Sequence, residues 1–369
     1  MIQSFRPHVG GAELQLERLA PLLAQRGVRS EVITRAMKGA PRVERIPGST
    51  IRRTPLRGES PLAALVYVVA ALAHLLGRRS RIDLVHAHGA LSPATIALGG
   101  RLFGLPCLVT VLGAGPPGDL ARLARKPLGR LRSRLLFRSA VFAALSAELR
   151  QELIERGVPP ERVLTLPNGV DLTVYRPAGP DERRALRGRL GLPPDGFVGT
   201  FVGRLHPVKD VDTLLEAAVR VPELTLVVLG DGPDRGRLEA VAARLGIEER
   251  VAFRGRSDAV AEFLRASDAF LLSSHGEGMS NALLEGMACG LPCLVSRSVG
   301  GATELLGEGR GVPLPDGDPD AWAAALRELV ADPRLRERTG SAAAAHVAET
   351  LSLEAAADRL ADAYRSLVA

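Results

Sequence analysis

The sequence predicts an α/β protein built from two doubly wound parallel sheets that face each other across a cleft. Ten short apolar runs alternate with helical stretches, the runs fall into two sets, and a Pro- and Gly-rich connector (167–180) separates the sets. A chain of 369 residues also exceeds one ordinary hydrophobic core. Because ligands bind outside the carboxyl ends of strands in such sheets, we expect the site in the cleft.

The strands are expected where β-branched and other apolar residues cluster. The first set is 29–35, 83–89, 107–113, 140–146 and 162–169, and the second is 197–205, 224–232, 250–255, 268–274 and 292–298. We place one domain at 1–167 and the other at 168–351, with a final helix at about 352–369 packing back on the first domain. Residues 1–5 leave room for only a short first strand.

Composition excludes several classes of protein. With 46% hydrophobic and 24% charged residues the chain is globular, and three cysteines without a C-x-x-C pair predict neither a disulfide framework nor a zinc site. Cys289 and Cys293 are expected to be buried. The apolar run 61–76 is short for a membrane span and predicts a buried crossover helix. Without a signal peptide, we expect a cytoplasmic protein.

Basic residues outnumber acidic ones, giving a net charge of +7, and all but three of the 48 basic residues are arginine. We interpret this bias as chain-wide composition. At 4% aromatic residues, without a stacking pattern, nucleic-acid binding is not expected. The segment from Arg122 to Arg138 nevertheless has seven cations and no acid, which predicts a solvated face, an anionic acceptor or a peripheral membrane contact. Its members are Arg122, Arg125, Lys126, Arg130, Arg132, Arg134 and Arg138.

Two glutamates eight positions apart, Glu277 and Glu285, lie in "HGEGMSNALLEGMACGLP" (275–292). Ser280 has the chemistry of a helix N-cap, and Gly290 with Pro292 that of a C-terminal stop. Glu277 is therefore expected in the loop before the helix and Glu285 on its second turn. Since a helix N-terminus attracts anions, the arrangement fits a phosphate-bearing ligand with hydroxyl groups, such as a nucleotide sugar.

Six motifs in order resemble the fourth family of retaining glycosyltransferases, which has the GT-B fold. They are "GGAE" (10–13), "PNGVD" (167–171), "GRLHPVK" (203–209), "GDGP" (230–233), "EGMSNALLEGMACGLP" (277–292) and "GGATE" (300–304). The resemblance covers nearly the whole chain. It implies transfer of a sugar from a UDP- or GDP-linked donor to a saccharide, lipid-linked saccharide or small alcohol, without cofactor or metal. Polysaccharide biosynthesis is the expected context.

The resemblance also assigns roles to donor-side residues. Arg204 and Lys209 match the basic pair that grips the diphosphate, and two cations there would stabilise the charge of the leaving group. Glu285 matches the acid that binds the ribose, and Glu277 the acid near the transferred sugar.

Backbone amides complete the implied donor site. Those of Gly278, Met279, Ser280 and Asn281 would meet sugar and phosphate, and those of Gly10 and Gly11 at a helix start would meet the diphosphate. "GDGP" would line the nucleotide side.

The acceptor side departs from the family's pattern. Members often have a histidine where this chain has Leu112, so the loop 113–118, beginning at Gly113, is a candidate source of backbone amides instead. His86 and His88 end a neighbouring strand and are candidates to meet the acceptor, with one expected to be structural. His206 and His275 flank the donor motifs.

Three other functions fit these motifs less well than sugar transfer. A sugar-nucleotide epimerase of the same fold would release UDP without acceptor, and a non-catalytic subunit is hinted at only by Leu112. A dinucleotide dehydrogenase is excluded, because no G-x-G-x-x-G follows a first strand.

Asp316 and Asp318 form a D-x-D pair. In another glycosyltransferase fold such a pair holds a metal ion, but here we interpret it as a turn and an N-cap. We therefore expect EDTA to leave activity largely unchanged, because the protein's own cations compensate the diphosphate. Turnover is measured with and without chelator. Strict dependence on a divalent ion, abolished by Asp316→Ala or Asp318→Ala, would contradict this expectation.

Overall fold

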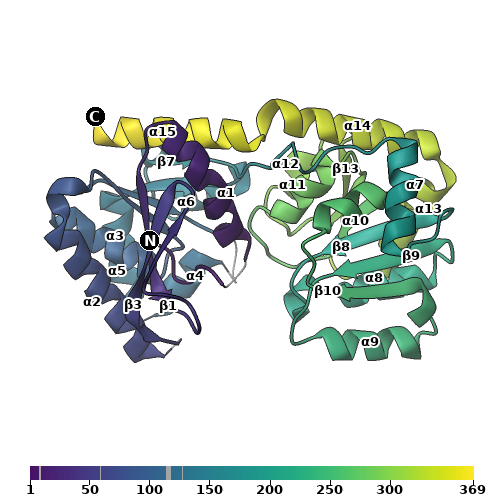
Figure 1. Cartoon of the computed structure of the whole chain (residues 1–369), viewed down its shortest axis with the longest axis horizontal. Helices are drawn as coiled ribbons and strands as arrows, with labels where there is room; N and C mark the ends of the chain where they lie inside the picture. Colours follow the sequence, from purple (N-terminus) through teal and green to yellow (C-terminus); the bar gives the residue numbers. More distant parts are fainter. Residues whose placement is uncertain (8–9, 59, 114–117, 127) are drawn as a thin grey trace. The chain divides into compact units, whose positions relative to one another are not determined.

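The computed structural model describes residues 1–7, 10–58, 60–113, 118–126 and 128–369 (Figure 1). Its internal contacts divide the chain into two compact units. Unit 1 comprises Met1–Gly169 with Leu353–Ala369, and unit 2 comprises Val170–Ser352. The final helix α15 (Leu353–Val368) therefore belongs to unit 1, where it packs on α1 (Gly11–Gln25).

Unit 1 has a sheet in two parts joined by the chain's first residues. A parallel part runs in the order β4-β5-β6-β7, and a second part in the order β1-β3-β2. Ile2 forms a bridge with His88 of β4 and donates its N–H to Ile33 of β1. The short first strand is thus a single bridge. The strands are β1 Ser30–Ala36, β2 Val43–Ile46, β3 Ser49–Arg57, β4 Val85–His88, β5 Cys107–Thr110, β6 Val141–Ala144 and β7 Val163–Thr165.

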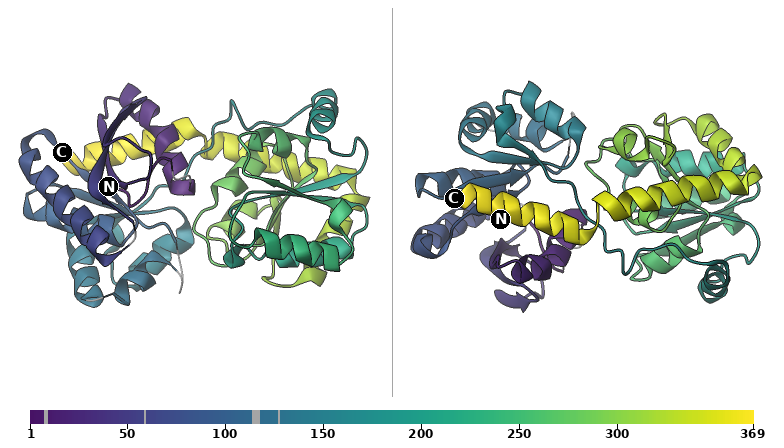
Figure 2. Two further views of the ribbon diagram at one scale, coloured as in Figure 1. Left: turned by 60° about the horizontal axis from the view of Figure 1, so that its bottom comes forward. Right: turned by 90° about the horizontal axis from the view of Figure 1, so that it is seen from above.

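Helices cover both faces of this sheet. Leu19 and Leu23 of α1 share a buried cluster with α15 and with Leu108 of β5. The other helices of the unit include α2, which packs on α3, and α3, which packs on α5; Figures 1 and 2 show α2 and α3 together at one end of the unit. They are α2 Pro61–Gly77, α3 Ser92–Leu102, α4 Asp119–Ala124, α5 Gly129–Ser139 and α6 Ala147–Glu155.

The apolar run 61–76 forms the expected helix, but the prediction that it is buried is wrong. Only Ala63, Tyr67, Ala71 and Leu75 of α2 are buried, on the side that faces the sheet. The opposite side exposes large apolar residues at 50–62% of their surface, namely Leu62, Leu65, Val69 and Leu76. Uniform hydrophobicity hides this difference, since burial of a helix depends on what packs against it. Among the described residues, none of the helices reaches the length and apolarity needed to cross a bilayer.

Unit 2 has one six-stranded parallel sheet in the order β10-β9-β8-β11-β12-β13. Its strands are β8 Phe197–Val202, β9 Leu224–Leu229, β10 Val251–Gly255, β11 Ala269–Leu272, β12 Cys293–Ser296 and β13 Gly311–Leu314. Its helices are α7 Pro180–Leu190, α8 Val211–Val219, α9 Arg235–Arg244, α10 Val260–Ala266, α11 Asn281–Ala288, α12 Ala302–Leu306, α13 Pro319–Ala331 and α14 Pro333–Thr350. The four inner strands, β8, β9, β11 and β12, are buried along most of their length, as expected for a sheet covered on both faces, while the edge strands β10 and β13 are only partly buried.

Local sequence sets several helix ends as predicted. Ser280 caps α11 by accepting a hydrogen bond from the Leu283 N–H, and Gly290 beyond its end is left-handed. Asp318 caps α13 in the same way, accepting from Asp320 and Ala321. All three cysteines are free thiols and buried, including Cys289 and Cys293.

All ten predicted strands form, although most are shorter than their apolar runs. The prediction missed β2, β3 and β13. β2 and β3 are an arginine-rich hairpin closed at Pro47-Gly48, and β13 contains a proline, which is tolerated because β13 is an edge strand.

A buried carboxylate ties α7 to the centre of the unit 2 sheet. Asp268 Oδ2 accepts from Arg187 Nη2 at 2.5 Å and from the Val198 N–H at 2.8 Å, and Oδ1 pairs with Arg183 at 3.1 Å. The Arg187 and Asp268 side chains are only 6% and 9% exposed. This cluster joins a helix to β8 and to the residue before β11.

We predict that Asp268→Ala lowers the free energy of unfolding of unit 2 by about 3–5 kcal/mol, because it leaves the Arg187 charge buried without a partner. Trp322, the only tryptophan, is fully buried in unit 2, so its fluorescence during urea denaturation reports this unit.

The matched control is Asp181→Ala, which removes an exposed pair with Arg184 on α7 of the same unit and should cost about 0–1 kcal/mol. Equal midpoints for Asp268→Ala and the wild type would show that the cluster does not stabilise unit 2.

Candidate functional site

Several chain segments meet at the carboxyl edge of the unit 2 sheet. They follow β8, β9, β11 and β12, and they contain the donor motifs named above. Because parallel strands deliver their carboxyl ends to one edge, residues up to about a hundred positions apart come together there.

Two glycines let the segments after β8 and β9 touch. A Cβ on Gly230 would lie 1.8 Å from the Gly203 carbonyl oxygen, and one on Gly232 would lie 2.0 Å from that of Leu205. The Leu205 N–H also donates to the Asp231 carbonyl at 3.0 Å. "GDGP" therefore holds the backbone on both sides of Arg204, and any side chain at these two positions would push the segment away.

Lys209 and Glu277 form an ion pair. Lys209 ends a 3-10 turn after β8 (Pro207–Lys209), and Glu277 lies in the loop between β11 and α11. Their side chains are 15% and 20% exposed, so both charges are largely withdrawn from bulk water. Sequence reasoning gave these residues separate roles and did not predict their contact.

Serine hydroxyls fix the loop that contains the ion pair. Ser273 and Ser274, which directly follow β11, donate to the carbonyls of Lys209 (2.9 Å) and Val208 (3.2 Å). The Gly300 N–H donates to the Glu277 carbonyl at 2.9 Å. The loops after β8, β11 and β12 therefore hold one another through backbone groups.

His275 lies beside the ion pair between two carboxylates. Its Nε2 is 3.0 Å from Asp210 Oδ2, and its Nδ1 is 3.5 Å from Asp316 Oδ2. Asp316 thus faces a histidine and the Ser298 N–H, while Asp318 caps α13. Among the described residues, no three His, Cys, Asp or Glu side chains are grouped so that they could hold a metal ion.

The two glutamates of the motif at 275–292 differ in their surroundings. Glu277 precedes α11 and is partly exposed, while Glu285 lies on the second turn and is 6% exposed. The placement of both acids relative to the helix start is as predicted. Gly278, Met279, Ser280 and Asn281 lead into this helix, so their amides lie at its N-terminus.

Arg204, in contrast, is exposed. Within the described part of the chain its guanidinium makes neither a hydrogen bond nor an ion pair. The site in unit 2 therefore combines a cation held by Glu277, a solvent-facing cation and a helix N-terminus, all of which favour an anion.

In unit 1 the two histidines of β4 have different environments. His86 Nδ1 lies 2.6 Å from the Tyr364 hydroxyl of α15, and its Nε2 lies 2.7 Å from Thr110 Oγ1. The His88 ring stacks on His86 with centroids 4.1 Å apart, and its nitrogens have no hydrogen-bond partner among the described residues. Burial lowers the pKa of His88 to about 3 and that of His86 well below its usual range. Both rings are neutral at neutral pH, and His86 is held on both sides.

Asp119 is a residue that sequence reasoning missed. Its Oδ2 accepts from the Leu112 N–H at 3.1 Å and the Ala90 N–H at 3.4 Å, so it joins the segments after β5 and β4. The Asp119 N–H donates to the Gly113 carbonyl. The remainder of the predicted loop, 114–117, lies outside the described residues. The signal in the sequence that could have identified Asp119 is its position as a lone acid ahead of seven cations.

Gly10 and Gly11 are placed as predicted relative to a helix. Gly10 is the N-cap of α1, with extended backbone and no side-chain cap, and a Cβ there would lie 2.5 Å from Glu13 Oε2. Gly10 thus begins α1 with a residue that has no side chain to cap it.

Both halves of the chain match known families. Residues 10–169 match the family described as "Glycosyl transferase 4-like domain", and residues 182–346 match "Glycosyl transferases group 1".

Relatives of known name align along almost the whole chain. A D-inositol 3-phosphate glycosyltransferase of Streptomyces bingchenggensis is 32% identical, covering 96% of this chain and 84% of that one. The protein of the same name from Thermomonospora curvata is 33% identical, with 96% and 90% covered.

Solved structures share the fold. Sucrose-phosphate synthase from Thermosynechococcus elongatus superposes with a TM-score of 0.83 at 23% identity, covering 99% of this chain and 94% of that one. HepE of Anabaena in complex with UDP gives a TM-score of 0.80 at 22% identity, with 99% and 98% covered.

Proposed function

The chain belongs to the fourth family of glycosyltransferases with the GT-B fold, and we propose that it moves a hexose from a UDP- or GDP-linked donor with retention at the anomeric carbon. It is a glycosyltransferase that uses a nucleotide sugar. The observation that carries the finer proposal is the cluster of Lys209, Glu277 and the α11 N-terminus at one sheet edge. These groups supply what a sugar diphosphate needs: compensating cations, an acid for sugar hydroxyls, and the backbone amides of a helix start.

In the proposed reaction the bond between the anomeric carbon and the diphosphate oxygen breaks. The acceptor oxygen bonds to that carbon from the same face, and its proton passes to the leaving phosphate. Arg204 and Lys209 stabilise the charge that grows on the diphosphate, so no metal is required. Gly278 to Asn281 supply amides to phosphate and sugar, and we also propose that Gly10 and Gly11 contact the diphosphate.

The two glutamates divide the rest of the donor. We propose that Glu285 accepts the ribose hydroxyls and that Glu277 contacts the transferred sugar. The ion pair adds a second role for Glu277, because it positions the Lys209 ammonium. Glu277 and the donor phosphate then compete for the same ammonium group. Two hydrogen bonds already occupy both nitrogens of His86, so His88 is the better candidate to meet the acceptor.

The names of the relatives favour a small cyclic alcohol bearing a phosphate as the acceptor. A saccharide or lipid-linked saccharide is the alternative. An epimerase or a non-catalytic subunit would bind a nucleotide sugar without consuming an acceptor.

The function is tested by melting the protein with a panel of UDP-, GDP- and ADP-sugars. A true donor at about 100 times its Kd should stabilise the folded state by about 2.7 kcal/mol. That donor is then incubated with and without inositol phosphate or saccharide acceptors. The proposal fails if none of the nucleotide sugars stabilises the protein, or if the donor is consumed at the same rate without acceptor.

We predict that Lys209→Ala lowers kcat/KM for the donor about 10- to 100-fold, because it removes a charged hydrogen bond at the diphosphate. Lys209→Arg should also be impaired, since a planar fork does not replace a compact ammonium paired with Glu277. Steady-state kinetics measure both variants. Lys38→Ala, at an exposed lysine of unit 1, is the control and should match the wild type. Unchanged kinetics in Lys209→Ala would remove Lys209 from the site.

The two glutamates are predicted to give different kinetic patterns. Glu285→Gln should raise KM with a smaller effect on kcat, costing about 10- to 100-fold in kcat/KM, because the ribose does not change during the reaction. Glu277→Gln should lower kcat, while donor affinity by titration stays within a few-fold, because Lys209 is then released to the phosphate. The exposed Glu239→Gln of α9 is the control. Identical patterns for Glu277→Gln and Glu285→Gln would refute the proposed division of roles.

A further inference from the structure

Unit 1 carries most of the exposed large apolar residues of the described chain. Eight of the fourteen lie on three helices that pack on one another in the order α2, α3, α5. They are Leu62, Leu65, Val69 and Leu76 of α2, Leu102 of α3, and Leu128, Leu131 and Leu135 at or within α5. Folded proteins rarely leave such a concentration facing water without a use for it.

The exposed side of α2 is apolar along its whole length. Leu62, Leu65, Val69 and Leu76 follow one another at helical spacing on the side opposite the buried residues. Gly99 allows α3 to pack closely on α2, since a Cβ there would lie 2.3 Å from Leu72. The exposed apolar face of α2 therefore borders α3.

The exposed leucines of α5 lie next to the side of that helix that faces α3. Arg132 donates to the Leu91 carbonyl and to Thr95 of α3, which marks the side of α5 that faces α3. At about 100° per residue, Leu135 and Leu131 lie about 60° and 100° from Arg132 around the helix, on the side away from buried Leu136. The exposed apolar residues of α2 and α5 thus flank α3.

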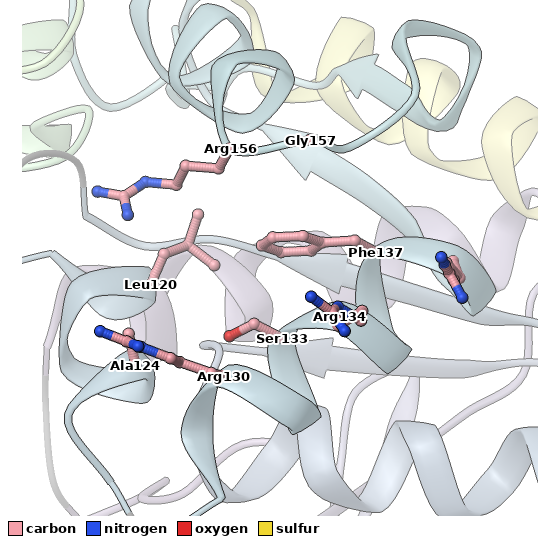
Figure 3. A pocket seen from close by; sticks show the side chains of 9 residues that line it. Leu120, Ala124, Arg130, Ser133, Arg134, Phe137, Arg156 and Gly157 are labelled. Atoms are coloured by element: carbon pink, nitrogen blue, oxygen red, sulfur yellow. The ribbon is translucent and has the colours of Figure 1, made fainter.

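Beyond these leucines α5 presents a row of arginines, Arg130, Arg134 and Arg138. None of the three guanidiniums has a partner in the described part of the chain. With Arg156 they line a cavity of about 440 Å³ that also contains Phe137 and Leu120. Figure 3 shows the Phe137 ring and Leu120 between the arginines of α5 and Arg156. Exposed leucines and unpaired cations therefore form neighbouring rows on this helix.

The net positive charge of the chain lies in residues 60–139, although the preference for arginine over lysine extends along the whole chain. Residues 60–139 contain eleven basic and two acidic residues, Asp83 and Asp119. The rest of the chain contains 37 basic and 39 acidic residues and is slightly negative. Asp119 is already engaged by two backbone amides.

We propose that the outer surface of α2, α3 and α5, here called the α2–α5 face, docks on a bilayer that contains anionic lipid. Exposed leucines enter the interface between headgroups and acyl chains, and the arginines bind lipid phosphates. A second copy is a poorer occupant, because a two-fold contact would place the same arginines against each other. This face lies outside the donor site, so docking does not depend on the proposed reaction.

The test is flotation of the full chain with vesicles of phosphatidylcholine mixed with phosphatidylglycerol, and with phosphatidylcholine alone. We expect binding to the anionic vesicles, weakening as salt rises to about 0.15 M, and little binding to the neutral ones. Leu65→Ser with Val69→Ser should lower the partition coefficient about 10- to 100-fold. The matched control is Val174→Ser with Val219→Ser, at similarly exposed valines of unit 2, and should bind as the wild type.

A second variant tests the charges without touching apolar residues. Replacing Arg130, Arg134 and Arg138 with glutamine should weaken binding to anionic vesicles about 100-fold. The same change at Arg184, Arg334 and Arg338, exposed arginines of unit 2, should have a much smaller effect. Circular dichroism melting checks that each variant is folded.

Three results would overturn the proposal. One is failure of the wild type to float with anionic vesicles at low salt. Another is equal loss of binding in the α2 or α5 variants and their unit 2 controls. The third is a dimer, seen by analytical ultracentrifugation, that the α2 substitutions dissociate while vesicle binding is absent; it would assign the face to a contact between copies.

Discussion

The parallel pairing of strands is the constraint on which the site in unit 2 depends. Each parallel strand must be followed by a crossover, so its carboxyl end and the loop after it lie at one edge of the sheet. The loops after β8, β11 and β12 then become neighbours, and serine hydroxyls and backbone amides hold them together. Gly230 and Gly232 add the loop after β9, because only the absence of a Cβ permits that approach.

Within this frame the ion pair of Lys209 and Glu277 couples the loop after β8 to the loop after β11. Two residues 68 positions apart share one interaction, and both are mostly shielded from water. A charge shielded from water is costly unless it is paired, so each of the two residues stabilises the charged form of the other. A diphosphate arriving at this site therefore meets a lysine that is already positioned and an acid whose attraction it must match. Arg204, which is exposed, carries no such coupling.

Unit 1 shows how an average can conceal a local property. The net charge of the whole chain is modest, yet the excess lies between residues 60 and 139, on helices that also expose leucines. On the same unit, His86 and His88 are adjacent in the strand pattern but differ in their bonding. Hydrogen bonds from α15 and β5 hold His86, while His88 stacks on it.

The sequence by itself determined the positions of ten strands, the caps at Ser280 and Asp318, the stop at Gly290 and the family motifs. These depend on local patterns, since short apolar runs, capping side chains and left-handed glycines act within a few residues. Only the tertiary structure decided which side of α2 is buried, that Lys209 contacts Glu277, and that Asp119 joins two strand ends. It also revealed β2 and β3, whose arginines obscure the alternation of a hairpin. Each of these features depends on which segment from a distant part of the sequence packs against the residue, and local sequence patterns do not contain that information.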